Sequence, residues 1–268
     1  MRRGWFLPIA ATLGFAFLYL PIISLVVFSF NENRLVTVWT GFSTKWYGEL
    51  FADKQMLGAA WLSLQIAFFA ATFALVLGTL CAVALVRFKR FRGRTVLAGT
   101  VSAPLVMPDV ITGLALLLLF VAMEGTLGWP AGRGIVTIII AHTTFCMAYV
   151  TVVVQSRLSD LDLSLEEAAM DLGATPARVF FDITLPIIAP ALVSGWLLAF
   201  TLSLDDLVIA SFVSGPGSST LPMVIFSKIK LGVSPDVNAL ATIIIGVVAL
   251  GVVGATLFSL SGRKKAKA

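Results

Sequence analysis

Three carboxylates stand out along the apolar stretches of this sequence. Asp109 interrupts one apolar run, and Asp205 and Asp206 follow directly after another. At about 1.5 Å per residue, Asp109 would lie about 20 Å from the start of its run. Ionised groups inside a membrane are costly and usually mark a pathway or a paired interior site. We therefore predict a cation pathway, with helix packing as the alternative for Asp109 and a solvated turn as the alternative for the adjacent pair.

Two further side chains within the apolar runs could take part in cation or proton binding. Trp196 lies in the middle of a run and could offer a cation–π face to an ammonium group, although core packing is the simpler interpretation. His142 is the only histidine, and without a partner at ligand spacing we interpret it as a packing residue. Cys81 and Cys146 show no disulfide or metal-ligand spacing. We predict neither a metal site nor a set of catalytic residues.

The composition excludes a water-soluble globule. Of 268 residues, 59% are hydrophobic and 12% are charged, whereas a soluble domain carries about 25% charged residues. The net charge of +5 comes from basic residues between the apolar runs, which argues against a nucleic-acid-binding surface. No Gly-x-x-x-x-Gly-Lys-[Ser/Thr] segment is present, so we expect no ATP hydrolysis through a P-loop of this chain. We predict that the chain is not an enzyme.

Six apolar stretches must position these side chains, and each is long enough to cross a bilayer. A helix needs about 20 apolar residues to span a hydrocarbon core of ~30 Å. The approximate spans are 5–30, 57–86, 96–123, 135–154, 187–204 and 237–260. The first exceeds the apolar region of a secretory signal, so we expect it to be retained. The sequence predicts an all-α, polytopic membrane protein with a single transmembrane domain over 1–268.

The distribution of lysine and arginine predicts the orientation of the spans. With the N-terminus inside, 13 of the 19 basic residues fall on the inner side and 6 on the outer side. The short segment 87–94 carries much of this bias. Because basic residues are enriched in cytoplasmic loops, we expect both termini in the cytoplasm.

One cytoplasmic segment, residues 156–186, is longer than a connector requires. Ser164 followed by Glu167 forms a capping box, which predicts a helix start. Gly173 is placed to end that helix in a left-handed conformation. Thr175, followed by proline, predicts the start of a second helix. A helix–glycine–helix elbow of this kind is either a docking element for a partner or an amphipathic connector on the membrane surface.

The same segment resembles the EAA motif of ABC importer permeases. The matching positions are Glu167, Ala168, Ala169, Gly173, Ile183, Leu185 and Pro186. In that family the loop forms a coupling helix in a groove of the cytoplasmic ATPase, so the resemblance implies ATPase coupling for these residues. Segments 105–111, 202–208 and 232–239 are similar to the smaller permease subunit of putrescine and spermidine importers, the polyamine branch of the family.

The resemblance implies a type I ABC importer permease fold in the bacterial inner membrane. The implied function is ATP-driven import of polyamines by alternating access, with putrescine as the preferred substrate and spermidine second. The implied partners are a dimer of P-loop ATPases, a second, homologous permease subunit and a periplasmic polyamine-binding protein, besides membrane lipid. ATP and Mg²⁺ would bind the ATPase, and no cofactor would bind this chain. The alternatives are a permease for another small solute and a secondary transporter.

Overall fold

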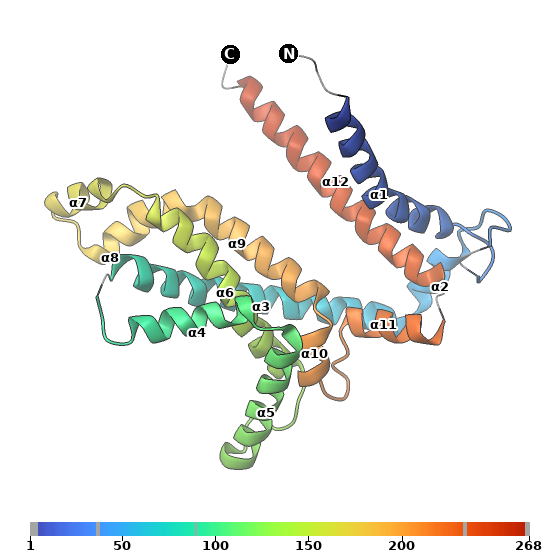
Figure 1. Cartoon of the computed structure of the whole chain (residues 1–268), viewed down its shortest axis with the longest axis horizontal. Coiled ribbons are helices and arrows are strands. Elements are labelled where there is room, and N and C mark those ends of the chain that lie inside the picture. Colours follow the sequence, from blue (N-terminus) through green and yellow to red (C-terminus); the bar gives the residue numbers. More distant parts are fainter. Residues whose placement is uncertain (1–4, 36–37, 89, 233–234, 266–268) are drawn as a thin grey trace. The chain divides into compact units, whose positions relative to one another are not determined.

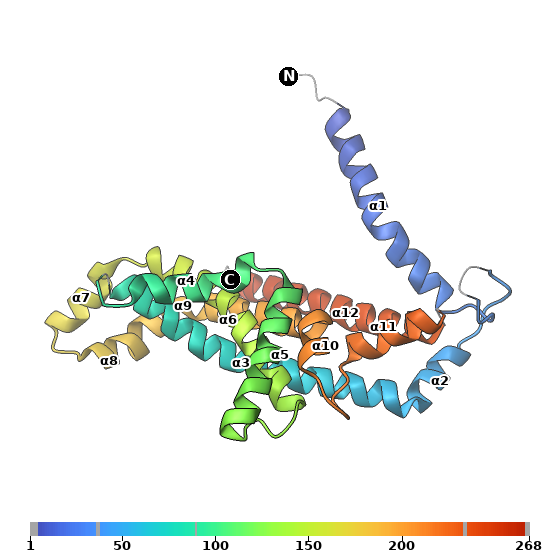
Figure 2. The same ribbon diagram turned by 60° about the horizontal axis from the view of Figure 1, so that its bottom comes forward.

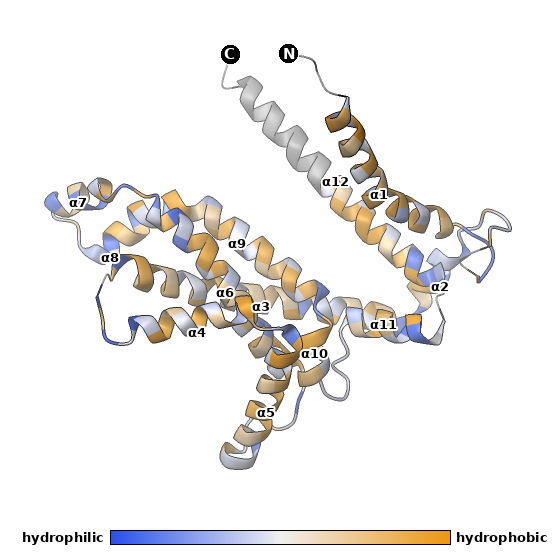
Figure 3. Cartoon of the chain, in the orientation of Figure 1, coloured by the Kyte–Doolittle hydropathy of each residue, from blue (hydrophilic) through white to orange (hydrophobic). Residues whose placement is uncertain are grey.

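The computed structural model describes residues 5–35, 38–88, 90–232 and 235–265, and every element named within them is a helix (Figure 1). Five helical stretches in these ranges are long and apolar enough to cross a membrane: Phe6–Phe28, Lys54–Arg87, Asp109–Leu127, Ile135–Ser159 and Pro176–Asp205. A further apolar helix begins at Pro235. Apolar residues predominate along α1, α5 and α9 (Figure 3). The all-α, polytopic prediction is confirmed.

The chain forms two compact units, and the single-domain expectation for 1–268 stays a prediction. The first unit comprises residues 1–57 and 225–268, and the second comprises residues 58–224. Several residues used in the sequence argument lie outside the described ranges, namely Arg2, Arg3, Lys89, Val233, Ser234 and Lys267.

The first unit contains α1 (Phe6–Phe28), α2 (Lys45–Ala52), most of α11 (Leu221–Leu231) and α12 (Pro235–Lys265). Helix α12 contacts both α1 and α2, whereas α1 has no buried residue. The link between α1 and α2 is held by Asn31, which is fully buried and accepts a hydrogen bond from Trp46 Nε1 at 2.6 Å on its backbone oxygen.

An ion pair of three residues joins distant segments of the first unit. Lys228 Nζ lies 2.7 Å from Asp53 Oδ2 and 2.7 Å from Asp236 Oδ2. The hydrogen bond from Lys228, with a backbone N–H from Met56, lowers the pKa of Asp53 below its usual value. Partial burial lowers the pKa of Lys228, but hydrogen bonds to Asp236 and Asp53 outweigh it and leave the pKa raised.

The core of the second unit is built on α6 (Ile135–Ser159), which packs against α4 (Arg94–Val106), α9 (Leu185–Asp205) and α10 (Val208–Val213). Small residues let the neighbouring helices approach it closely. A Cβ on Gly78 of α3 (Lys54–Arg87) would lie 2.9 Å from the Val150 side chain, and one on Gly195 of α9 (Leu185–Asp205) would lie 3.6 Å from it. Val150 therefore marks the point where α3, α6 and α9 meet.

The predicted span 96–123 contains Pro104 and Pro108, which are expected to bend a helix or open its backbone, and the structure shows an opening at Pro108. It is divided into α4 (Arg94–Val106) and α5 (Asp109–Leu127), with Met107 and Pro108 extended at ψ 137° and 139°. Pro108 supplies no N–H and disfavours helical geometry at the preceding residue, so α4 ends there. Asp109 is consequently the first residue of α5 and is exposed in this chain, rather than embedded within a continuous helix. The other predicted spans agree with observed helices, with shifts at their ends.

Candidate functional site

Segment 156–186 forms the predicted elbow, with one corrected cap. It consists of α7 (Leu163–Asp171), α8 (Pro176–Val179) and a π-helical turn, η1 (Phe180–Thr184), that leads directly into α9. Asp162, not Ser164, caps α7, because its Oδ1 accepts a hydrogen bond from the Ser164 backbone N–H at 3.0 Å. Thr175 caps α8 through a 3.4 Å hydrogen bond from the Arg178 N–H, as predicted.

Gly173 ends α7 in the left-handed conformation that the sequence predicts. Its φ is +88°. The Gly173 N–H donates to Met170 O at 2.9 Å, and the Ala174 N–H donates to Ala169 O at 3.1 Å. This pair of bonds is the Schellman pattern, which satisfies the last carbonyls of a helix and reverses the chain.

The EAA-like residues divide between the two arms of the elbow. Glu167 and Ala168 are exposed on α7, and Ala169 is half-buried. Ile183 and Leu185 are half-buried where η1 meets α9, and Pro186 is exposed. Leu172, next to Gly173, has 90% of its surface exposed. An exposed apolar side chain beside small residues suits a surface that a partner approaches closely, and the coupling role of these residues stays a prediction.

Glu166 fastens α7 to the helices that continue into the membrane. Its Oε1 accepts hydrogen bonds from Arg87 Nη2 and from Thr184 Oγ1, each at 2.7 Å. The Arg87 and Glu166 side chains are only 18% and 14% exposed. A cavity of about 390 Å³ lies beside this link, lined mainly by apolar residues that include Val83, Leu158, Met170, Val179 and Phe180. The elbow is thus tied both to the end of α3 and to the start of α9.

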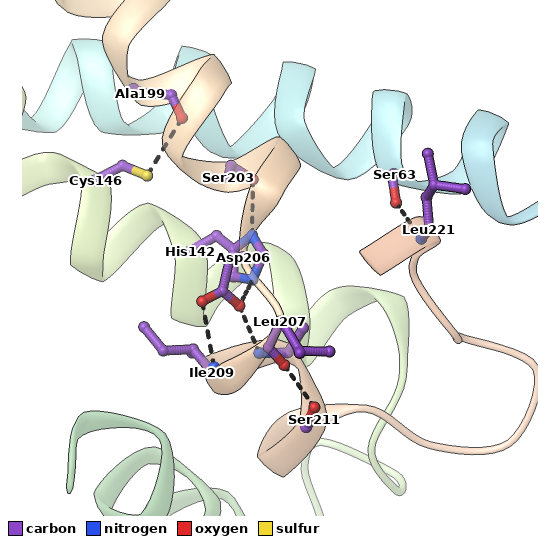
Figure 4. Close-up of polar contacts among 11 residues, drawn as sticks. Ser63, His142, Cys146, Ala199, Ser203, Asp206, Leu207, Ile209, Ser211 and Leu221 are labelled. Atoms are coloured by element: carbon purple, nitrogen blue, oxygen red, sulfur yellow. Dashed lines mark hydrogen bonds and ion pairs between the residues drawn. The ribbon is translucent and has the colours of Figure 1, made fainter. Parts of the chain in front are cut away.

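Asp206 lies at the break between α9 and the short helix α10 (Val208–Val213) and is held from two directions (Figure 4). Its carboxylate accepts the N–H groups of Ile209 at 3.3 Å and Ala210 at 2.8 Å. Its Oδ2 also lies 3.1 Å from His142 Nε2, and His142 Nδ1 lies 2.7 Å from Ser203 Oγ. The solvated-turn alternative is wrong for Asp206, whereas Asp205 beside it is exposed.

The two helix breaks lie next to each other in the second unit. Helices α5 and α10 run side by side from the ends of α4 and α9 (Figures 1 and 2). A Cβ on Gly113 would lie 2.7 Å from the Phe212 ring and 3.3 Å from Ile209 Cα, so only glycine permits this approach. Gly113 follows Asp109 by one helical turn, and Ile209 belongs to the first turn of α10. The two breaks therefore lie in one region of the second unit, and a pathway shared by their carboxylates stays a prediction.

Trp196 packs within an aromatic cluster on α9 and α3. Its ring stacks on Phe200 at 5.2 Å between centroids and meets Phe68 edge-on at 5.9 Å. Its Nε1 lies 3.2 Å from Thr72 Oγ1. This geometry favours the packing interpretation, and a cation–π role for Trp196 stays a prediction. In the part of the chain that the structure describes, no three His, Cys, Asp or Glu side chains gather to hold a metal ion.

The family follows from the match of most of the chain. Residues 74–267, which include the elbow and both helix breaks, match the family described as "Binding-protein-dependent transport system inner membrane component". The chain belongs to this family. It is therefore a membrane component of an import system and not a catalytic subunit, which also sets aside the secondary-transporter alternative.

Relatives of this permease cover nearly its whole length. It is 62% identical to the putrescine transport system permease protein PotI of Escherichia coli, over 98% of this chain and 92% of the relative. It is 48% identical to the spermidine/putrescine transport system permease protein PotC of Haemophilus influenzae, over 86% of this chain and 87% of the relative. These matches confirm the resemblance found in the sequence.

Solved structures support the predicted fold of the permease. A bacterial ABC transporter involved in alginate import aligns with a TM-score of 0.71 at 18% identity, over 97% of this chain and 98% of that one. The MetNI methionine ABC transporter aligns with a TM-score of 0.59 at 16% identity, over 75% and 92% of the two chains. The type I ABC importer permease fold is confirmed.

Sequence reasoning missed the two side chains that organise these sites. Glu166 is not singled out by the sequence analysis, and its partners Thr184 and Arg87 lie 18 and 79 residues away. His142 was correctly read as a buried, satisfied residue, but its partners Ser203 and Asp206 lie 61 and 64 residues away. No local pattern links residues across such distances.

Proposed function

We propose that this permease carries polyamines across the inner membrane, with putrescine as the preferred substrate and spermidine second. The observation that carries the proposal is the 62% identity to a putrescine permease over 98% of the chain. A diamine that leaves water needs fixed anionic partners, because an unpaired buried charge is very costly. Asp109 and the pair Asp205 and Asp206 supply carboxylates at the two adjacent helix breaks.

The polarity of the apolar spans also favours a cationic substrate. The six predicted spans contain no lysine or arginine. A permease for an anionic solute would require lysine or arginine side chains along its pathway. The predicted spans offer none, so an anionic substrate is the less favoured alternative.

The complete importer would contain a second, homologous permease subunit, two copies of a P-loop ATPase and a periplasmic binding protein that delivers the polyamine. The family description names binding-protein-dependent transport, and the absence of a P-loop motif in this chain is consistent with a separate ATPase. ATP and Mg²⁺ would bind that ATPase, and this chain would bind no cofactor. Both termini and the elbow would face the cytoplasm.

The elbow would couple ATP-driven closure of the ATPases to the pathway. Glu166 ties α7 to Arg87 on α3, and η1 joins the elbow directly to α9. Helix α9 has 21 residues, so its length of about 30 Å matches the hydrocarbon core and separates the elbow from Asp205. A movement of the elbow would shift α9 as a rigid rod and alternate access to the carboxylates.

Neutralising the carboxylates tests this function. Asp109→Asn and the double variant Asp205→Asn, Asp206→Asn should each reduce putrescine uptake about tenfold or more, since a lost charged contact of about 1.5–3 kcal/mol corresponds to that factor. The assay is uptake of labelled putrescine by the reconstituted importer, with subunit stoichiometry measured in parallel. Glu124→Gln, at the other end of α5, is the matched control and should transport normally.

Wild-type uptake by intact importers that carry the neutralised residues would show that these carboxylates are structural. Selectivity would then have to reside in the binding protein or in the second permease.

A further inference from the structure

His142 is the only described side chain of α6 that forms a charged or polar bridge to the joint between α9 and α10. The His142 side chain is 1% exposed and that of Asp206 is 8% exposed. Figure 4 shows the imidazole ring between Ser203 and Asp206, with one ring nitrogen directed to each. The joint is thus anchored to the helix at the centre of the second unit.

The protonation pattern of this network follows from the partners. An ionised carboxylate only accepts hydrogen bonds, so the His142 Nε2 atom must carry the proton that faces Asp206. In neutral His142, Nδ1 then accepts a hydrogen bond from the Ser203 hydroxyl, which can donate. Every group in the bridge is satisfied without a substrate.

The two adjacent aspartates therefore have different surroundings. The Asp206 carboxylate already accepts from His142, Ile209 and Ala210. Asp205, the last residue of α9, is exposed. A carboxylate with three donors in the protein has little capacity left for an ammonium group, whereas an exposed one can approach a substrate.

We propose that His142 and Asp206 are positioning residues that fix the break between α9 and α10, and that Asp205 is the carboxylate of this pair that contacts the polyamine. This inference rests on the proposed polyamine pathway. The backbone at Asp206 is extended, with ψ 124°, so the chain direction changes immediately after Asp205. Holding Asp206 to α6 sets that change of direction and with it the placement of the Asp205 side chain.

Two kinds of variant at Asp206 and His142 distinguish a positioning role from direct contact with the substrate: those that can keep the hydrogen bonds of the bridge and those that cannot. Asp206→Asn can keep the bridge, because an amide oxygen in the Oδ2 position still accepts from His142 Nε2 and from the Ala210 N–H, and only the longer contact with the Ile209 N–H is lost. Asp206→Ala cannot. In the same way His142→Gln keeps an amide that can donate toward Asp206, whereas His142→Leu leaves a buried carboxylate without that donor.

The experiment is the concentration dependence of labelled putrescine uptake by the complete reconstituted importer. Asp205→Asn, Asp206→Ala and His142→Leu should raise the KM about tenfold, while Asp206→Asn and His142→Gln should stay within about threefold of the wild type. Adding His142→Leu to Asp205→Asn should raise the KM no further, because both changes remove the same contact. Thr143→Val is the matched control, since the buried Thr143 hydroxyl has no partner among the described residues.

The outcomes distinguish this inference from the proposed function. If Asp206→Asn is as damaging as Asp206→Ala, or if His142→Leu and Asp205→Asn add fully, Asp206 contacts the substrate and the division of roles is overturned, while the polyamine pathway stands. If Asp205→Asn leaves the KM unchanged while Asp109→Asn raises it, Asp205 is not in the pathway and the inference fails alone. Wild-type uptake by all of these variants would overturn both.

Discussion

Replacing Gly173 by valine should uncouple the ATPase from transport without preventing assembly. Gly173 has φ +88°, and a residue with a Cβ pays about 1–2 kcal/mol in this region of conformational space. A β-branched side chain is an outlier there. A Cβ at this position would meet nothing within 4 Å, so the whole effect comes from the backbone and none from a clash.

The size of this effect is enough to reshape the elbow. The two hydrogen bonds that close α7, from the Gly173 and Ala174 N–H groups, are worth about 1 kcal/mol each in a typical protein. A conformational penalty of about 1–2 kcal/mol therefore competes directly with the bonds that reverse the chain. The turn would relax, and the exposed side chains of α7 would change direction relative to α8.

The assay is ATP hydrolysis and putrescine uptake by the same reconstituted importer, expressed as uptake per ATP. We expect Gly173→Val to lower this ratio strongly, Gly173→Ala to have an intermediate effect, and Gly173→Asn to have the smallest effect, because asparagine tolerates the left-handed conformation. Gly48→Val is the control, since Gly48 lies in α2, has no positive φ, and an added Cβ there would meet nothing within 4 Å. Normal coupling by Gly173→Val would refute the docking role of the elbow.

Three other outcomes are expected. Glu166→Gln should lower uptake per ATP. The double variant Glu166→Arg, Arg87→Glu reverses the ion pair and should restore part of the uptake per ATP. No recovery in this double variant would mean that the link is not a simple ion pair. The folded-state pKa of Asp53 is lowered and that of Lys228 is raised. Their pairing should therefore stabilise the purified permease between about pH 4 and pH 10, and this stabilisation should decline as the pH falls below the ordinary aspartate range or rises through the raised lysine pKa. In thermal unfolding, Lys228→Met should remove the alkaline part of this dependence and weaken the acid part, where the Met56 N–H still favours the ionised Asp53. A reporter fused after Lys265 should be cytoplasmic, and periplasmic labelling would reverse the assigned orientation.

The parts of the permease that could be predicted from sequence are those determined locally. Gly173 and Thr175 act on backbone groups within a few residues, so the elbow follows from residue types and spacing. The helices follow from apolar length, because a membrane leaves few alternatives to a helix. The correction at the start of α7 is also local. Asp162 and Ser164 are both residue types that cap helices, and in the structure it is the Asp162 carboxylate that accepts the Ser164 backbone N–H.

The rest depends on contacts between distant segments. The break at Pro108 had a local signal, but a proline in a membrane helix can bend the helix or end it. Here α10 packs closely against Gly113 and supports a separate α5. The same holds for Asp206, whose burial depends on His142 in another helix. The positions of these breaks thus have local signals in the sequence, whereas the contacts that hold them in place are visible only in the structure.

The most direct test of the account is ATP-driven putrescine uptake by the complete importer, purified through this chain and reconstituted in liposomes with its binding protein. The account predicts uptake of labelled putrescine that requires ATP, continues when ion gradients are collapsed, and is inhibited by excess spermidine only at higher concentration than by excess putrescine. Uptake that needs an ion gradient in place of ATP, or an importer that carries another class of solute and leaves putrescine outside, would contradict it.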